Sequence, residues 1–191
     1  MPKISSTKDL IMLLLYAKGH TNKLHEPIQG RTRLMKMIFL FEKEIRNKFN
    51  LDKKISEDAL PEFKPYDYGP YSDKVYTDLE FLIDTGFVNV KKLGEVEENE
   101  EEMLEYQYWQ ANMSTEDEYK ASVGIDEFKL TERGKGFVEK ELNDISQEQW
   151  NIVNLFKARC TGIPLKTLLR YVYANYPAMT SKSKIRNEVM S

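Results

Sequence analysis

Apolar residues recur along this chain with two periods, and the change between them predicts the order of the elements. In residues 8–18 and 31–49 they fall every three or four positions, as on one face of an α-helix. Within the second segment, residues 35–41 are apolar apart from one lysine, which predicts the central helix of the core. A third helix is predicted over residues 73–85, with Gly86 as its left-handed cap.

The segment from residue 63 to residue 72 is predicted to join the core to this third helix. It contains two prolines, one glycine and three tyrosines. Because proline disfavours a helical conformation in the residue before it, we expect extended backbone here, a sharp turn at Gly69-Pro70 and a helix start at Ser72. This joint is therefore expected to organise the fold.

Strand-like patterns follow the third helix. Residues 87–90 predict a short strand, and residues 104–111 alternate apolar with polar positions, the period of a half-buried strand. Six glutamates lie between residues 92 and 103, and so many like charges predict a solvated hairpin tip. Strand, tip and strand would form a wing, with residues 118–123 and 128–130 as further extended segments.

The last third of the chain has a helical pattern. Ser146 and Gln149 form a predicted capping box for one helix, and Pro164 stands at the start of another. The order of elements predicts an α+β fold. We expect a winged-helix-like domain at residues 1–145, followed by a two-helix C-terminal extension with a basic tail at residues 146–191.

Five motifs together resemble a known family. They are Gly30-Arg-Thr-Arg-Leu-Met-Lys-Met-Ile-Phe-Leu40, Tyr66-Asp-Tyr-Gly-Pro-Tyr-Ser72, Leu79-Glu-Phe-Leu-Ile-Asp-Thr-Gly-Phe-Val88, Leu130-Thr-Glu-Arg-Gly134 and Tyr173-Ala-Asn-Tyr-Pro177. On these motifs the chain resembles the YwgA-like proteins of bacteria and archaea, which are similar to the wider Panacea group of SocA-like antitoxins. The resemblance implies a winged-helix-like fold and, through the Panacea group, neutralisation of a toxin by protein contact.

The net charge of -3 is distributed unevenly. Lys and Arg against Asp and Glu number 16 to 13 in residues 1–92, 5 to 17 in residues 93–148, and 7 to 1 in residues 149–191. This distribution is not that of a uniformly basic nucleic-acid binder. Either the acidic middle and the basic end match each other within the molecule, or they meet different partners.

Composition narrows the class of protein further. A chain of 191 residues with 41% hydrophobic residues suits one domain with a helical extension. There is no apolar run of about 18 residues and no signal-like start, which predicts a cytoplasmic protein with no membrane span. The single cysteine, Cys160, is expected to be a small buried hydrophobe.

Catalytic chemistry has little support in the sequence. It contains no Gly-rich phosphate loop and no evident Ser-His-Asp set, so we expect no enzyme and no cofactor. His20, His25 and Glu26 are close in sequence, but no further ligand at a suitable spacing accompanies them, so no metal site is expected.

The first candidate site is the outward face of the third predicted helix. Projection at 100° per residue places these side chains opposite its apolar stripe: Asp73, Thr77, Glu80, Phe81 and Asp84. With the glutamates of the wing this acidic face would repel DNA, which argues against the usual reading of DNA by helix and wing. Phe81, an aromatic residue among polar ones, indicates a protein partner, and Tyr71 lies near it in sequence. The alternatives are burial of Phe81 under the C-terminal helices and packing of the tyrosine within the joint.

The second candidate site is a basic edge. Arg31, Arg33, Lys36 and Lys43 lie in the predicted central helix, the last three opposite its main stripe. Lys166 and Arg170 would extend the edge if the C-terminal helices fold onto the N-terminal half. Three interpretations of this edge are open. It is a solvated face, or it contacts phosphates or an acidic partner. The third is that it pairs with the acidic middle of this chain or of a second copy.

The expected function is that of a non-enzymatic interaction module, antitoxin-like or regulatory, which binds a basic protein partner through the acidic face. A toxin is one such partner. The alternative is a winged-helix DNA-binding transcriptional regulator that uses the basic edge. A homo-oligomer stays open as a further state, and no membrane association is expected.

Overall fold

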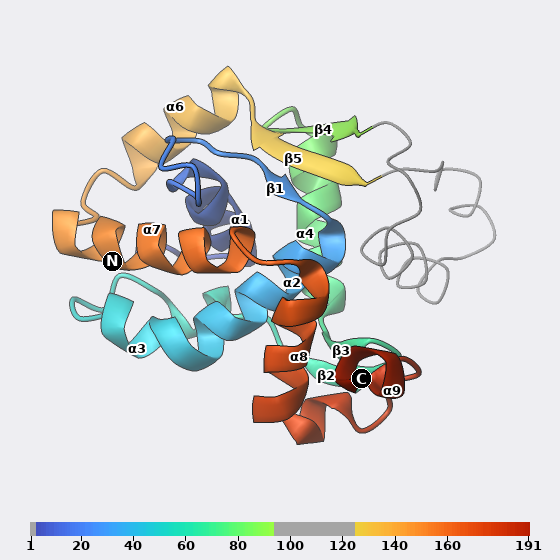
Figure 1. Ribbon diagram of the computed structural model, residues 1–191. Coiled ribbons are helices and arrows are strands. Elements are labelled where there is room, and N and C mark those ends of the chain that lie inside the picture. Colours follow the sequence, from blue (N-terminus) through green and yellow to red (C-terminus); the bar gives the residue numbers. More distant parts are fainter. Residues whose placement is uncertain (1–2, 94–124) are drawn as a thin grey trace.

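The structure, a computed structural model, describes residues 3–93 and 125–191. The structure combines helices with two small antiparallel sheets that lie towards one side of the molecule, so the predicted α+β class is confirmed (Figure 1). Most of the predicted wing tip, and the strands predicted at 104–111 and 118–123, lie outside the described residues.

Helix α1 (Thr7–Tyr16) begins at a capping box. The Ser6 hydroxyl accepts a hydrogen bond from the Asp9 amide, and the Asp9 carboxylate accepts one from the Ser6 amide. The chain leaves the helix in an extended conformation at Ala17, one residue before the helical pattern of residues 8–18 ends.

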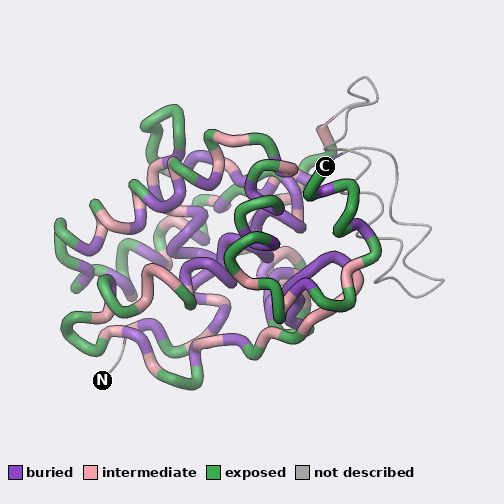
Figure 2. The backbone as a smooth tube through the Cα atoms, turned by 60° about the horizontal axis from the view of Figure 1, so that its bottom comes forward, coloured by how far each residue is buried: buried purple, intermediate pink, exposed green. Residues whose placement is uncertain are grey.

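The predicted central helix is confirmed at the centre of the core. It consists of α2 (Arg31–Leu40), a π-helical turn η1 (Phe41–Ile45) and α3 (Arg46–Phe49). All residues from 32 to 40 are buried, which matches a helix packed on several sides. Figure 2 shows buried backbone passing through the interior, with exposed segments at the periphery. In the widened turn, the Arg46 amide donates to the carbonyl of Phe41.

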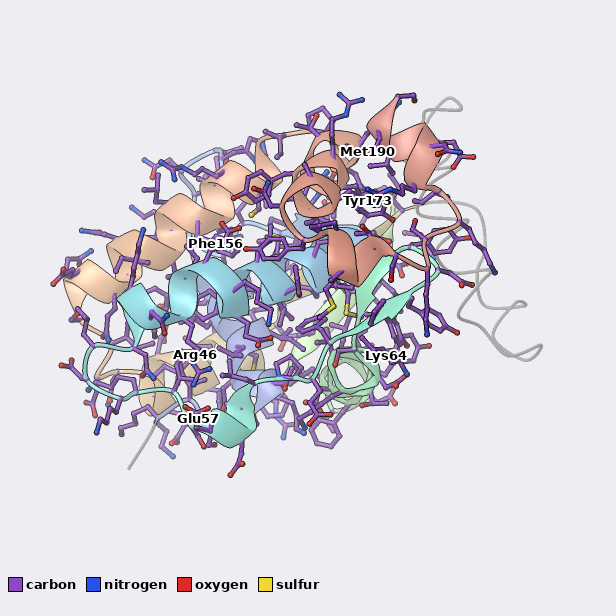
Figure 3. The ribbon with its side chains drawn as sticks, turned by 90° about the horizontal axis from the view of Figure 1, so that it is seen from below. Arg46, Glu57, Lys64, Phe156, Tyr173 and Met190 are labelled. Atoms are coloured by element: carbon purple, nitrogen blue, oxygen red, sulfur yellow. The ribbon has the colours of Figure 1, made fainter. Side chains whose placement is uncertain are left out.

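The joint between residues 63 and 72 is a β-hairpin. It follows the short 3-10 helix η2 (Glu57–Ala59), which Arg46 of α3 contacts through Glu57 (Figure 3). Strands β2 (Lys64–Tyr66) and β3 (Gly69–Tyr71) pair antiparallel, with Tyr66 opposite Gly69. The chain therefore turns at residues 67–68, and the predicted turn at Gly69-Pro70 was wrong because both residues belong to the second strand.

The hairpin requires glycine at position 69 for two reasons, the backbone conformation there and the lack of room for a side chain. The φ of Gly69, 89°, lies in the left-handed region, where side chains are disfavoured. A Cβ at this position would also lie 3.0 Å from Cε1 of Tyr173, on the C-terminal helix α8 (Leu165–Asn175). The hairpin is thus packed tightly against the C-terminal helices.

Helix α4 (Asp73–Asp84) starts at Ser72 and is followed by Gly86 with φ 75°, as predicted. The chain then enters a three-stranded antiparallel sheet. Its order is β1 (Ile28–Gln29), β5 (Asp126–Leu130), β4 (Val88–Lys92). The sequence did not predict β1, because a two-residue strand has no measurable period.

Helix α6 (Glu132–Glu141) packs on the sheet through a close backbone contact at its start. Thr131 caps the helix by accepting a hydrogen bond from the Gly134 amide. A Cβ on Gly134 would lie 2.2 Å from the carbonyl oxygen of Phe87, whereas one on Gly136 would meet no atom within 4 Å. Only the first of these glycines is needed for close approach.

The C-terminal helices complete the core. Helix α7 (Gln147–Thr161) begins at the predicted capping box of Ser146 and Gln149, and α8 begins after Pro164, its N-cap. The basic tail forms a 3-10 helix, η3 (Pro177–Thr180), and the short helix α9 (Arg186–Met190).

One hydrophobic cluster contains buried residues from both sides of the predicted boundary at residues 145/146. From α7, Phe156 lies against the helical run of α2 to α3, with its ring centroid 5.9 Å from that of Phe41 (Figure 3). The division of the chain into a domain and an extension stays a prediction.

The two glycines of α6 provide a matched test of this packing. We expect Gly134→Ala to lower the free energy of unfolding by about 1–3 kcal/mol, because the new methyl group overlaps the Phe87 carbonyl. Gly136→Ala, which meets open space, should raise it by about 0.5–1 kcal/mol through helix propensity. Urea-induced unfolding of both variants measures the difference; equal effects would contradict the predicted contact.

Candidate functional site

The residues predicted to meet a protein partner lie on α4, and we call their shared outer surface the α4 face. It consists of Asp73, Thr77, Glu80, Phe81 and Asp84. Four of the five are exposed, and Glu80 is partly buried. The helix therefore presents them together, because positions three or four residues apart share a side of a helix.

Phe81 is exposed on this face rather than buried under the C-terminal helices. Its relative exposure is 48%, high for a side chain of this size. The ammonium of Lys8 lies 4.8 Å from the centre of the ring, close enough for a cation–π contact. The ring thus stands on the surface beside a cation supplied by α1.

The acidic side chains around Phe81 are compensated within the molecule, which the sequence did not predict. Asp73 binds Lys64 at 2.7 Å, and Asp78 binds Lys8 at 3.0 Å and Lys74 at 3.3 Å. Glu80 pairs with Arg31. The net acidic face expected from the projection is therefore largely neutralised, by Lys74 of the same helix and by Lys8, Lys64 and Arg31 from other segments.

Tyr71 does not belong to the α4 face. It is 7% exposed, and its ring stacks on that of Tyr66 with the centroids 5.2 Å apart. Burial raises the pKa of its hydroxyl above the ordinary value. The structure thus has Tyr71 packed within the joint, which is the alternative to a partner contact that the sequence left open.

The predicted basic edge does not form as a surface, because two of its members are buried. Arg33 is 5% exposed and donates to the carbonyls of Cys160 and Ile163, at 2.7 and 2.8 Å. Lys36 is fully buried and donates to the carbonyl of Pro70 at 2.8 Å. Lys43 is exposed beside Glu42. The projection failed because polarity alone does not show that a long cationic side chain can reach a carbonyl on another element.

Arg31 joins α4 to the β4–β5 hairpin. Its guanidinium pairs with Glu80 and donates to Asp126, with Nε 2.7 Å from the carboxylate. Asp126 also binds Lys92 at 2.7 Å. These cations lower the pKa of Asp126 although burial alone would raise it. Arg31 is thus committed to a structural network rather than to an open basic edge.

The cations of the C-terminal helices and tail also make contacts within the protein. Arg170 donates to the carbonyl of Val189 at 3.1 Å, and Lys166 is partly buried. In the tail, Lys184 binds Asp67 at 2.6 Å, and Arg186 donates to Thr180 at 2.7 Å. The basic tail therefore fastens α9 to the hairpin of β2 and β3.

The described residues contain no group of three or more His, Cys, Asp or Glu side chains placed to hold a metal ion. His20 lies 2.8 Å from Glu26, while the ring of His25 packs edge-on against Tyr16. Cys160 is buried, as predicted, and its burial raises the pKa of the thiol to about 12.

Comparison with protein-family models, curated protein sequences and solved structures gives no match to this chain. In residues 3–93 and 125–191, no helix has both the length and the apolar character that crossing a membrane requires.

Replacing Lys36 tests whether its buried ammonium holds the hairpin. We expect Lys36→Ala to lower the free energy of unfolding by about 2–5 kcal/mol, because it leaves a cavity and a buried carbonyl without its donor. Lys43→Ala, an exposed position seven residues along, is the control and should change it by less than about 0.5 kcal/mol. Denaturant unfolding measures both; equal small effects would contradict the assigned role.

The Asp126 network predicts an acid-dependent contribution to stability. Because the folded-state pKa is lowered, this contribution is present above the unfolded-state pKa of about 3.9 and is lost as pH falls through the folded value. At pH 7, Asp126→Asn should destabilise the protein by about 1–3 kcal/mol. The gap between wild type and variant should shrink in unfolding experiments carried from pH 7 towards pH 2; a constant gap would contradict the network.

Proposed function

We propose that this protein is a non-enzymatic interaction module that binds a basic protein partner through the α4 face. The exposure of Phe81 carries the proposal. A large aromatic ring surrounded by polar groups is a common anchor for protein association, because burying it contributes apolar area while the rim excludes water. An antitoxin-like or regulatory role, with a toxin as one class of partner, accords with the resemblance to the YwgA-like and Panacea proteins.

The charge of the neighbouring sequence supports a basic partner. Residues 94–124 contain ten Asp and Glu residues against one Lys. The chain enters and leaves this segment next to Lys92 and Asp126, and Arg31 links Asp126 to Glu80 of the α4 face. The described ends of this acid-rich segment are thus linked through Arg31 to a residue of the α4 face, and opposite charge on a partner would favour its approach.

The order of elements supports a winged-helix-like interpretation of the first part of the chain. Helices α1, α2 and α4 precede the hairpin of β4 and β5. In the proposed arrangement, α4 is the helix before the wing. It carries the exposed Phe81, and most charges around this ring are already paired within the protein, which favours a protein rather than DNA as its partner.

The alternative function, DNA binding through a basic edge, has less support. Arg33 and Lys36 are buried and donate hydrogen bonds to backbone carbonyls. Arg31 is paired with the carboxylates of Glu80 and Asp126. Phosphate binding needs cations that reach the surface. Of the four cations predicted on the central helix, only Lys43 has an exposed side chain.

Replacement of Phe81 tests the proposal. Tagged wild type, Phe81→Ala and Leu155→Ala are used to capture partners from the native host; Leu155 of α7, 54% exposed, is the matched control. We expect a basic protein to be retained by wild type and the control but not by Phe81→Ala. With purified components, titration calorimetry should show binding weakened about tenfold or more by Phe81→Ala.

A second variant tests the charge component. Neutralising the glutamates at 95, 97, 98 and 100–102 to glutamine should also weaken capture, because it removes attraction to a basic surface. Retention of no protein by wild type, or of one and the same set by wild type and both test variants, would overturn the proposal. Equal unfolding midpoints of all variants confirm that folding is not the cause of any loss.

A further inference from the structure

A cleft of about 880 Å³ lies away from the α4 face, with which it shares no residue. Its walls come from the loop after α1, from β5, from the start of α6 and from the turn between α7 and α8. This volume falls in the range of small-molecule sites. The cleft therefore has the size of a binding site that the protein-binding proposal does not use.

Two buried cations hold the walls of this cleft. From α7, Lys157 donates to the carbonyls of Leu15, Ala17 and Glu26 at 3.3, 2.7 and 2.5 Å, which fixes both ends of the loop after α1. Burial lowers the pKa of this lysine to about 7, and the three acceptors favour its charged form. On the other side, Arg33 donates to the carbonyl of Cys160 in the last turn of α7 and to that of Ile163 in the turn that follows.

The loop itself is held in an uncommon conformation. The backbone φ angles of Asn22 and His25 are positive, 58° and 60°, and residues other than glycine rarely adopt such values. Within the described residues, Nε2 of His25 is buried without a hydrogen-bond partner. Strained backbone and an unsatisfied polar atom both have a free-energy cost, and such features concentrate at binding sites.

Positive charge prevails in the lining. Lys23, Arg33, Lys129 and Lys135 face two acids, Glu26 and Glu127. Both acids are already bound within the protein, Glu26 by Thr21 and His20, and Glu127 by Gln29.

In the described part of the chain, no lysine of the lining is held in a buried ion pair, so all three can meet an anion. Among the described residues, neither Lys23 nor Lys129 has an ion-pair partner, and Lys135 pairs with the exposed Glu132. With Glu132 included, four cations still stand against three carboxylates around the cleft, and this excess of positive charge would favour an anion there.

We propose that this cleft binds a phosphorylated small molecule of nucleotide or sugar-phosphate size, with its phosphate at Lys129 and Lys135. Lysine ammonium groups bind phosphate oxygens as point charges through charge-assisted hydrogen bonds. The uncharged part of the ligand would contact the apolar lining at Leu24, Ile163 and Pro164. Leu24 is 45% exposed at the cleft, so a ligand would cover apolar surface there as well.

The chain offers a direct readout of this cleft. It has two histidines, His20 and His25, and both line the cleft. Their imidazole signals in ¹H–¹³C NMR spectra report on it without interference from other histidines, and His20→Gln assigns them. Burial and the ammonium of Lys135 lower the pKa of His25, so a bound anion beside Lys135 should raise it.

The experiment titrates the full chain with AMP, adenosine and inorganic pyrophosphate. We expect AMP and pyrophosphate to shift the histidine signals saturably at millimolar concentration and adenosine to shift them less. Lys129→Gln combined with Lys135→Gln should weaken AMP binding about tenfold or more, since two charge-assisted contacts are lost. Lys91→Gln, an exposed lysine on β4 of the same sheet, is the control and should leave binding unchanged.

Two results would overturn the proposal. One is the absence of saturable shifts with either phosphorylated probe. The other is equal AMP affinity in wild type and the double variant, with unfolding midpoints showing that both are folded. Loss of partner capture by Phe81→Ala has no bearing on these results, so the two proposals fail independently.

Discussion

The buried ammonium of Lys36 donates to the carbonyl of Pro70, and the path of the chain around the core depends on this contact. A charge removed from water is unfavourable unless its donors are satisfied, so separating α2 from the hairpin would take an acceptor away from that buried ammonium. Ser72, the N-cap of α4, comes two residues after Pro70. The contact therefore also fixes where α4 leaves the core and where Phe81 meets solvent.

Arg33 and Lys157 act on the same principle. Each is buried, and each donates to backbone carbonyls in or at the end of a connecting segment. Loop carbonyls lack the partners that helices and strands provide, and a buried donor satisfies them at a defined position. Cations that a count of charges assigns to the surface therefore organise the interior, which is why the basic edge is absent and the walls of the cleft are fixed.

Much of the fold could be predicted from the sequence because it depends on neighbours three or four residues apart. The capping boxes at Ser6 and Ser146 and the left-handed cap at Gly86 are of this kind, as are the apolar stripes of the helices. Strand β1 could not be predicted, because its two residues pair with β5 about a hundred residues later. The turn of the joint was misplaced, because its position depends on strand register rather than on the glycine and proline themselves.

The candidate site could be predicted only in part, for a related reason. Helical projection correctly grouped Thr77, Phe81 and Asp84 on one side of α4, since that grouping is local. It did not show that Arg31 and Lys8 neutralise Glu80 and Asp78, because these pairs join residues 49 and 70 positions apart. Nor did it show that a strand would bury Tyr71.

These internal ion pairs determine how a basic partner would be recognised. A cation of the partner gains little from Asp73 or Glu80 while each keeps its own lysine or arginine, since exchanging one exposed pair for another changes the free energy only slightly. Long-range attraction would then come mainly from the acid-rich residues 94–124, and short-range affinity from covering Phe81. The charge of residues 94–124 would chiefly set the association rate. The burial of Phe81 would chiefly set the dissociation rate.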